Sequence, residues 1–389
     1  MIRFLTAGES HGKCLIGVLE GLPRGIAIDT GFIDRELRRR QVGPGRGGRM
    51  QIEQDQIEIL SGVRQGKTLG SPISFCIRNR DFENWKIPMS VEEAPEGSDL
   101  RSVTRPRPGH ADLAGALKYQ THDIRDVLER ASARETAVRV AGGAFCRLFL
   151  DRFGIRIGSH CLAVGSERIG AQFEEPAIEK ILALAASPLR CADPEAEKRM
   201  MARIDEAEQA GDTLGGIIET AAGPIPPGLG SHIQWDRRLD GQIAQAMMSI
   251  PSAKAVEIGS GIEGAQMPGS GFHDEIFYDA GTRRFLRHTN RAGGIEGGIS
   301  NGADIRVRVF LKPIPTLRRP LRSSDVGSKK AFDAAVERGD TCVVPAAGTV
   351  AEAMLAMVLA GAFREKFGGD SIGEIEANYR NYLQLLDEY

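Results

Sequence analysis

The feature that most constrains the fold is an apolar segment close to the C-terminal end. Residues 349–367 are apolar on nearly every side of a helix up to Arg364, and a glycine pair, Gly368 and Gly369, follows them. A helix without a polar face has to be covered on several sides, and glycine is a common helix end. The sequence therefore predicts a central buried helix here and a second well-packed helix over residues 132–153.

Alternating apolar residues predict two half-buried strands. One strand is expected around residues 73–77 and the other over residues 305–311, where every second residue is apolar. The alternate positions include Arg78, Arg306 and Arg308, so one face of each strand is expected to be polar. This alternation favours antiparallel sheets.

The chain shows no division into separate domains. Its motifs lie in all four quarters of the sequence, and no Ser/Pro-rich linker or composition shift interrupts it. We therefore expect residues 1–389 to form one large domain of the α+β class, with a site assembled from distant loops. A weak internal similarity between residues 17–40 and residues 216–248 predicts a duplicated β-turn-β-α unit.

The charge is balanced overall but uneven along the chain. With Lys+Arg 50 and Asp+Glu 52 the formal net charge is -2, which argues against a general nucleic-acid binder, because such binding needs a basic surface. The arginines nevertheless gather in clusters, namely Arg38, Arg39, Arg40, Arg46 and Arg49; Arg101, Arg105 and Arg107; and Arg130, Arg134 and Arg139. These clusters predict a local site for a small anion, although solvated helix and loop faces would give the same pattern.

The six cysteines are scattered without a CxxC spacing. Neither a zinc site nor a disulfide framework is therefore expected. No basic-then-apolar signal region follows Met1, and the longest apolar stretch is too short to span a bilayer. We expect a cytoplasmic protein that binds neither a metal nor a membrane.

Short loops in two places each present a histidine. The first places Ser10 and His11 between glycines, where the backbone can turn sharply and approach a ligand. The second, residues 107–112, places His110 after a Pro-Gly turn, with Asp112 near enough in sequence to orient it. An imidazole can deliver a proton near neutral pH. Either loop alone would equally suit a structural or exposed histidine.

The segment around Ser132 predicts the start of a helix. Ser132 stands at the N-cap position, with Glu135 as its capping-box partner. Arg130 and Arg134 flank this start, although the positive end of a helix dipole favours acidic residues. A bound anion would resolve that conflict.

Glycine-rich stretches in this chain do not match the familiar nucleotide-binding loops. Residues 43–48 lack the Gly-Lys-Ser/Thr ending of a Walker loop. Within the second stretch, residues 290–302, the glycines of residues 293–298 lack the strand, spacing and helix of a dinucleotide fold. The second stretch would allow a flat ligand to lie against bare backbone. A rigid turn that follows offers one cation, Lys312, and one hydroxyl, Thr316. Asp340 lies just before the apolar helix and could hydrogen-bond nearby backbone amides or act as a base.

Taken in order along the chain, these motifs closely resemble the chorismate synthase family. The resemblance spans residues 6–367 and rests on the ordered set of blocks rather than on any one of them. The blocks are residues 8–12, 38–49, 59–63, 107–112, 132–136, 292–302, 312–316 and 340–342.

The resemblance implies a lyase that converts 5-enolpyruvylshikimate 3-phosphate to chorismate by 1,4-elimination of phosphate. This reaction is the last common step toward the aromatic amino acids. The resemblance also implies reduced FMN as a cofactor without net redox change, core helices sandwiched between antiparallel β-sheets, and a homotetramer. NADPH, used by the enzyme itself or by an external flavin reductase, is the implied reductant.

Individual residues acquire roles by the same resemblance. His11 would protonate the departing phosphate, His110 would lie near flavin N1, and Asp340 would support proton removal near flavin N5. Ser10 and Ser132 would hold hydrogen bonds in the site. The implied substrate ligands are Arg40, Arg46, Arg49, Arg107 and Arg134, of which Arg40 and Arg46 are the alternative NADPH ligands. The implied flavin contacts are Arg130, Ala131, Ser132, Pro251, Ser252, Gly297, Lys312, Pro313, Ile314, Pro315, Thr316 and Arg338.

Two positions depart from the common family pattern. Gly339 stands where most members have a histidine, and the arginine segment is longer than usual, which leaves open whether Arg39 or Arg40 faces the ligand. Two other functions also fit the motifs taken singly. They are a flavin-dependent reductase, suggested by the glycine-rich loop, and an RNA-binding module, suggested by the arginine clusters.

Overall fold

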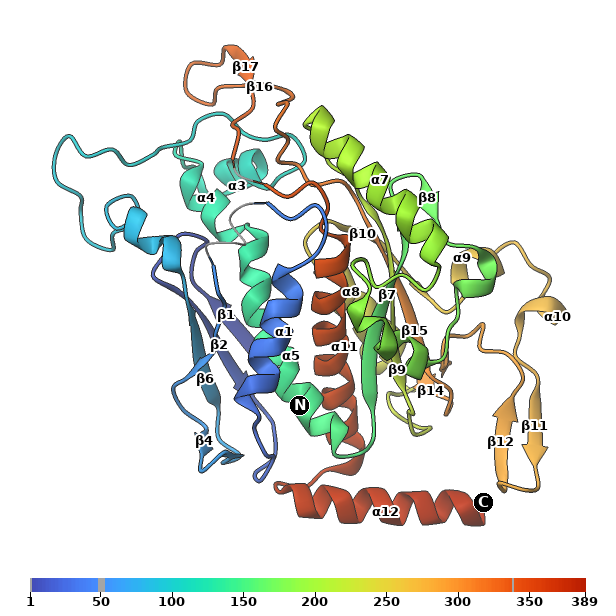
Figure 1. The fold of residues 1–389 in the computed structure, drawn as a ribbon. Helices are drawn as coiled ribbons and strands as arrows, with labels where there is room; N and C mark the ends of the chain where they lie inside the picture. The colour runs from blue at the N-terminus through green and yellow to red at the C-terminus, as the bar shows by residue number, and fades with distance from the viewer. Residues whose placement is uncertain (1, 48–52, 338) are drawn as a thin grey trace.

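Two main antiparallel sheets enclose a layer of helices in the computed structural model (Figure 1). The structure describes residues 2–47, 53–337 and 339–389. The first sheet has the strand order β1-β2-β6-β3, with β1 Arg3–Ala7, β2 Cys14–Glu20, β6 Ile73–Arg78 and β3 Glu58–Ile59. The second has the order β10-β15-β9-β7-β8, with β10 Ala253–Ile258, β15 Ile305–Leu311, β9 Gly216–Gly223, β7 Arg156–Val164 and β8 Glu167–Arg168.

The helix layer is built around α11 (Val344–Phe367) and α5 (Thr136–Asp151), which pack against each other. Beside α5 lies α1 (Thr30–Gln41), and beside α11 lies α8 (Leu239–Met248). Helix α5 contacts β2 of the first sheet, whereas α11 contacts β7 and β9 of the second. The predicted α+β class and the sandwich of helices between antiparallel sheets are therefore confirmed. Both sheets share one helix layer in the described residues, and the single domain over residues 1–389 stays a prediction.

Helix α11 is the buried helix that its composition predicts. It begins earlier than predicted, at Val344, and Pro345 in its first turn is compatible with a helix start. The expectation that the longest apolar stretch is too short to span a bilayer is wrong, because the length and composition of α11 would suit a membrane-crossing helix. Even so, 83% of its most apolar window is buried inside the protein. It is therefore a core helix. Glu352 interrupts its apolar surface and accepts hydrogen bonds from Arg39 and Ser159 at 2.8 and 2.6 Å.

One predicted feature of β15 is wrong. The alternation predicts a polar face in contact with solvent, but Arg306 and Arg308 are only 6% and 7% exposed. Both donate hydrogen bonds to Glu219 on β9, at 2.7 and 3.0 Å. Arg306 also donates to the carbonyl of Pro176 at 2.6 Å, and α6 (Ile178–Ala183) packs on β7 and β9. The alternation within a strand does not reveal which segment covers its polar side.

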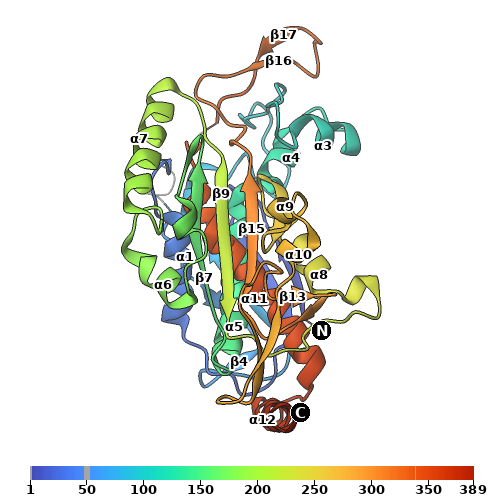
Figure 2. The same ribbon diagram turned by 90° about the vertical axis from the view of Figure 1, so that its right-hand side faces the viewer.

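Short helices and hairpins extend from this sandwich. Figure 2 looks onto the second sheet, with α7 (Pro194–Ala210) running beside it. The weak internal similarity corresponds to β2 followed by α1 and to β9 followed by α8, a strand and a helix in each half of the sandwich. The second strand of the predicted β-turn-β-α unit is wrong, because only isolated bridges at Arg24, Ala27 and Gly230 occur in these described segments. The other elements are β4 Val63–Arg64, β5 Lys67–Thr68, α3 Asp112–Tyr119, α4 Arg125–Arg130, α7 Pro194–Ala210, α9 Gly261–Gly264, α10 Gly269–Phe272, β11 Ile276–Asp279, β12 Arg284–Arg287, β13 Ile295–Glu296, β14 Ile299–Ser300, β16 Arg322–Ser324, β17 Ala331–Asp333 and α12 Ile372–Glu388.

The substitution Gly143→Ala tests the close packing of α5 against α11. A Cβ at position 143 would lie 2.3 Å from the Cβ of Ala353 on α11, so the helices would have to separate. We expect the free energy of unfolding, measured by urea denaturation, to fall by about 1–3 kcal/mol, although alanine has the higher helix propensity.

The matched control is Gly373→Ala on α12, where an added Cβ would meet no heavy atom of the described residues within 4 Å. This variant should keep or raise the free energy of unfolding. If both variants change the stability equally, the proposed close packing is incorrect.

Candidate active site

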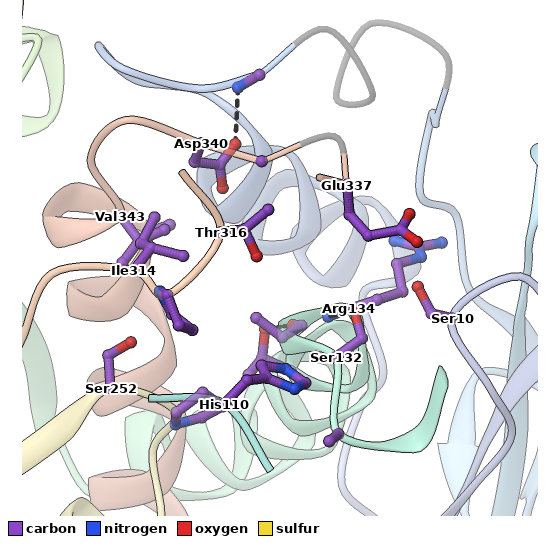
Figure 3. Close-up of a pocket in the computed structure, with 18 of the residues that line it drawn as sticks. Ser10, His110, Ser132, Arg134, Ser252, Ile314, Thr316, Glu337, Asp340 and Val343 are labelled. Atoms are coloured by element: carbon purple, nitrogen blue, oxygen red, sulfur yellow. Dashed lines mark hydrogen bonds between the residues drawn. The ribbon is translucent and has the colours of Figure 1, made fainter. Parts of the chain in front are cut away.

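One end of the helix layer opens into a cavity of about 350 Å³ (Figure 3). The cavity lies where α5 and α11 begin and where α1 ends, and loops from both sheets complete its walls. The helix layer thus directs two helix N-termini, which favour anions, toward one space. A cavity of this size is typical of sites for small molecules and cofactors.

Most of the predicted site residues line this cavity. They are Ser10, His11, Arg40, Arg46, Arg107, His110, Ala131, Ser132, Arg134, Pro251, Ser252, Lys312, Ile314, Pro315, Thr316 and Asp340. Figure 3 shows Ser10 and Arg134 at one end and Ser252 at the other, with His110 and Ser132 between them. Arg49 and Arg338 lie outside the described residues.

Among the described residues, three predicted flavin contacts do not line the cavity. Arg130 donates instead to the carbonyl oxygens of Gly8 and Thr6, at 2.9 and 3.0 Å, and so supports the loop between β1 and β2. Gly297 lies in the turn between β13 and β14, and Pro313 is flanked by lining residues without being one of them. The structure thus gives Arg130 a supporting position behind the first histidine loop.

A carboxylate that sequence reasoning missed holds His11. Both oxygens of Glu129, on α4, lie 2.9 Å from His11 Nδ1, and one of them accepts the backbone N–H of His11 at 2.8 Å. Trp85 stacks on the imidazole with 4.0 Å between ring centroids. Burial by itself would raise the pKa of Glu129, but its bonds with His11 lower it. Glu129 is therefore an ionised partner of His11 at neutral pH.

His110 has a carboxylate partner of its own, in the position that the sequence predicts. Asp112 Oδ1 lies 2.5 Å from His110 Nδ1, and Arg107 donates to Asp112 and to Thr316, both at 2.9 Å. Burial would raise the pKa of Asp112, but its hydrogen bonds with His110 and Arg107 lower it well below 3.8. Each histidine is therefore held at Nδ1 by a buried, ionised carboxylate.

The cavity arginines are paired with carboxylates. Arg40 and Arg134 share Asp55, at 2.8 and 2.7 Å, and Arg46 donates to Asp340 at 2.5 Å. Burial is the main reason why the pKa of Arg40 falls to about 10; Asp55 opposes this change, and Arg134 and Arg46 add to it. A bound anion would therefore meet cations that already carry counter-ions.

Ser132 caps a helix start, but the predicted capping box is wrong. The hydroxyl of Ser132 accepts the backbone N–H of Arg134 at 3.3 Å, where the 3-10 helix Ala133–Glu135 leads into α5. The carboxylate of Glu135 turns to the first sheet instead and accepts the hydroxyl of Thr6 at 2.9 Å. A contact with a distant strand thus replaces the local one.

The structure separates the two candidate arginines of α1. Arg40 is 3% exposed and lines the cavity, whereas Arg39 turns away and pairs with Glu352 at 2.8 Å. Gly339 is the other position that departs from the family pattern. A Cβ added to it would lie 3.1 Å from Cγ2 of Thr316. A histidine at this position would therefore crowd Thr316.

Much of the remaining wall of the cavity is apolar, apart from Thr136 and the carboxylate of Glu337. It includes residues that sequence reasoning did not select, namely Leu128, Ile250, Val343, Ala346, Ala347 and Val350, which join the predicted Pro251, Ile314 and Pro315. Gly109 allows the chain to pass close to Lys312, because a Cβ there would lie 3.3 Å from Lys312 Nζ. Burial lowers the pKa of Lys312. An apolar wall beside a cation suits a planar ligand with an anionic group.

Histidines held by carboxylates, paired arginines and an apolar wall together define an enzyme site for a small anionic substrate beside a planar ligand. Comparisons with known proteins give the family. The family model for chorismate synthase matches residues 2–363. Chorismate synthase of Solibacter usitatus is 53% identical over 100% of both chains, and that of Aquifex aeolicus is 54% identical over 100% of this chain and 99% of the relative.

A solved structure described as "Crystal Structure of Chorismate Synthase" has the same fold. It superposes with a TM-score of 0.80 at 44% sequence identity and covers 100% of this chain and 99% of that chain. The chain belongs to the chorismate synthase family. Members of this family are lyases that form chorismate in the shikimate pathway, and they need reduced flavin.

The cavity does not favour the alternative of an RNA-binding module. The described arginines of the cavity are buried in ion pairs, unlike the exposed cations of an RNA-binding surface.

The substitution Asp55→Asn tests the shared carboxylate. At neutral pH it would leave two buried guanidinium groups without their common counter-ion, and breaking a buried pair costs about 3–5 kcal/mol. Burial would raise the pKa of Asp55, but Arg40 and Arg134 lower it from 3.8. Its stabilising contribution is therefore complete above that value and is lost as the pH falls through the folded-state pKa. The variant and the wild type should become more alike in acid.

Urea denaturation of both proteins at neutral pH and at about pH 3 measures this difference. The control is Asp205→Asn on α7, which removes an exposed carboxylate and should leave the free energy of unfolding unchanged. A destabilisation by Asp55→Asn that stays constant down to acid pH would contradict the interpretation.

Proposed function

We propose that this chain converts 5-enolpyruvylshikimate 3-phosphate to chorismate by 1,4-elimination of phosphate, with bound reduced FMN and no net redox change. The observation that carries the proposal is the convergence of His11, His110 and the cavity arginines beside one apolar wall. The substrate carries a phosphate and two carboxylates, and planar guanidinium groups suit such anions. Similarity to the family over nearly the whole chain supports the same reaction.

In this reaction we assign the proton for the departing phosphate to His11. A cationic imidazole can neutralise the charge that develops on the phosphate oxygen as the C–O bond breaks. Ser10, the neighbouring cavity residue, would donate a hydrogen bond to the same group. The electrons of the broken ring C–H bond form a new double bond, the existing ring double bond shifts by one position, and the phosphate leaves with the electrons of the C–O bond.

The apolar wall and the polar groups beside it would hold the flavin. When bound, reduced flavin supplies electron density that stabilises the allylic carbon from which phosphate departs. His110, held by Asp112, would balance the charge of the cofactor, and Lys312 would pair with an anionic group of it. The proposed flavin ligands are Ala131, Ser132, Pro251, Ser252, Lys312, Ile314, Pro315 and Thr316. Arg338, which lies outside the described residues, stays part of this proposal, whereas Arg130, Gly297 and Pro313 are left out because they do not line the cavity.

The cavity arginines would hold the substrate. They are Arg40, Arg46, Arg107 and Arg134, and Arg49, which lies outside the described residues, stays part of this proposal. Arg46 is paired with Asp340, whose other oxygen accepts the backbone N–H of Gly47 at 2.7 Å. A substrate anion that binds Arg46 would release Asp340 to support proton removal.

Supply of the reduced flavin requires an electron donor. We propose NADPH as this donor, used either by the enzyme itself through Arg40 and Arg46 or by an external flavin reductase. An anaerobic assay that compares NADPH alone with chemically reduced FMN distinguishes the two sources of reduced cofactor.

We also propose that the protein forms a homotetramer in the cytoplasm.

Replacement of either cavity histidine should impair the chemical step. We expect His11→Ala to lower kcat by about 100- to 10,000-fold, the usual contribution of general acid catalysis, and His110→Ala to lower it as well. Anaerobic chorismate formation with chemically reduced FMN measures kcat, and FMN fluorescence measures cofactor binding, which should persist. His122→Ala, at an exposed position, is the control with wild-type turnover. Wild-type turnover in both cavity variants would refute the assignment.

The redox-neutral reaction makes a separate prediction. With reduced FMN supplied, chorismate should accumulate without continuous oxidation of NADPH, because the elimination neither consumes nor releases electrons. Simultaneous measurement of NADPH absorbance and chorismate formation tests this. Stoichiometric NADPH consumption per product would favour the flavin-dependent reductase instead.

A further inference from the structure

We propose that Glu129 is a positioning residue that acts through His11. It fixes the imidazole at Nδ1 and places a negative charge beside the ring as the ring gives its proton to the leaving phosphate. This inference rests on the role proposed above for His11.

Three kinds of contact join Glu129 to the first histidine loop. Its carboxylate accepts the backbone N–H of His11 at 2.8 Å and lies 2.9 Å from Nδ1 through both oxygens. Its own carbonyl accepts the backbone N–H of Ser10 at 2.9 Å. One residue of α4 thus fixes both the backbone of the loop and the imidazole, so the ring cannot rotate without losing its contacts at Nδ1.

The pair is shielded from water. The side chain of Glu129 is 1% exposed and that of His11 is 11% exposed. Trp85 covers one face of the imidazole, and the guanidinium groups of Arg101 and Arg125 lie 4.3 and 5.0 Å from the ring centroid of Trp85. Because little water separates the two charges, the carboxylate acts strongly on the imidazole.

Charged groups face this pair from several segments, and one of them is Glu337, which lines the cavity and lies 3.3 Å from Arg125. Arg125 on α4 donates to Glu129 at 3.2 Å, and Asp81, in the 3-10 helix Arg80–Asn84, lies 3.9 Å from His11 Nε2. Burial raises the pKa of Glu129, yet its bonds with His11 and Arg125 lower it overall. An ionised carboxylate at Nδ1 favours the imidazolium form, which is the form that a proton donor needs.

The variant Glu129→Gln removes the charge but keeps an oxygen that can accept from Nδ1. We expect kcat at neutral pH to fall about tenfold, and the pH above which kcat declines to move down by about one unit, since one unit is a tenfold change in protonation ratio. KM for the substrate should change less than kcat, because Glu129 does not line the cavity. Chorismate formation with chemically reduced FMN over a pH series measures both quantities.

The matched control is Glu219→Gln. Glu219 is also buried and also bonds a histidine, with 3.2 Å to His160 Nε2, but it lies on the second sheet outside the cavity. Its replacement should lower the stability without moving the pH dependence of kcat. Equal shifts in the two variants would mean a general effect of destabilisation and would overturn the inference.

Glu129→Asp provides a second, charge-conserving variant. It should keep the wild-type pH dependence even where its shorter side chain lowers kcat. A shifted pH dependence in Glu129→Asp would therefore also overturn the inference, and this comparison holds even if Glu129→Gln does not fold.

A double variant separates this inference from the role of His11 itself. If Glu129 acts through His11, Glu129→Gln has no further effect on kcat in the His11→Ala background. An impaired His11→Ala together with an unchanged pH dependence in Glu129→Gln would overturn the inference alone. Wild-type turnover in His11→Ala would overturn the proposed role of His11, and the inference with it.

Discussion

The contact between α5 and α11 is the interaction on which the rest of the structure depends. Gly143 lets the backbone of α5 approach Ala353 of α11. Gly142, also on α5, lies close to Met357 of α11 and to Phe4 on β1 of the first sheet. Helix α5 packs against the first sheet and α11 packs against the second. The contact between the two helices therefore sets the distance between the sheets. It also shapes the cavity, because both helices begin there.

Charge compensation is the second condition for the fold. Glu352 lies in the middle of the helix layer and pairs with Arg39, Arg147 and Arg190, which ties α1 and α5 to α11. The cavity follows the same rule, since its arginines carry carboxylate partners before any ligand binds. Buried guanidinium groups without such partners would destabilise the protein. Ligand binding therefore exchanges one set of counter-ions for another instead of neutralising a bare cluster of cations.

Local patterns predict the central helix and two of the strands, β6 and β15, and the ordered motifs indicate most segments of the site. Residues 349–367 are apolar on nearly every side of a helix, which predicts that other segments pack around it. The ordered motifs identify the loops that meet at the cavity. The acidic partners could not be found in this way. Glu129 lies 118 positions from His11, and nothing in the sequence connects the two. Similarly, the burial of Arg306 depends on the segment around Pro176, which comes from a distant part of the chain.

The place of α11 in the chain has a consequence for folding during synthesis. A helix of this length and apolarity resembles a membrane-insertion signal while it is exposed. Its partners α5, β7 and β9 precede it in the sequence, so they have already left the ribosome when it emerges, and burial can follow at once. A circular permutant that began at Val344 would reverse this order. Its most apolar segment would then emerge first and face the translocation machinery and other nascent chains without a partner.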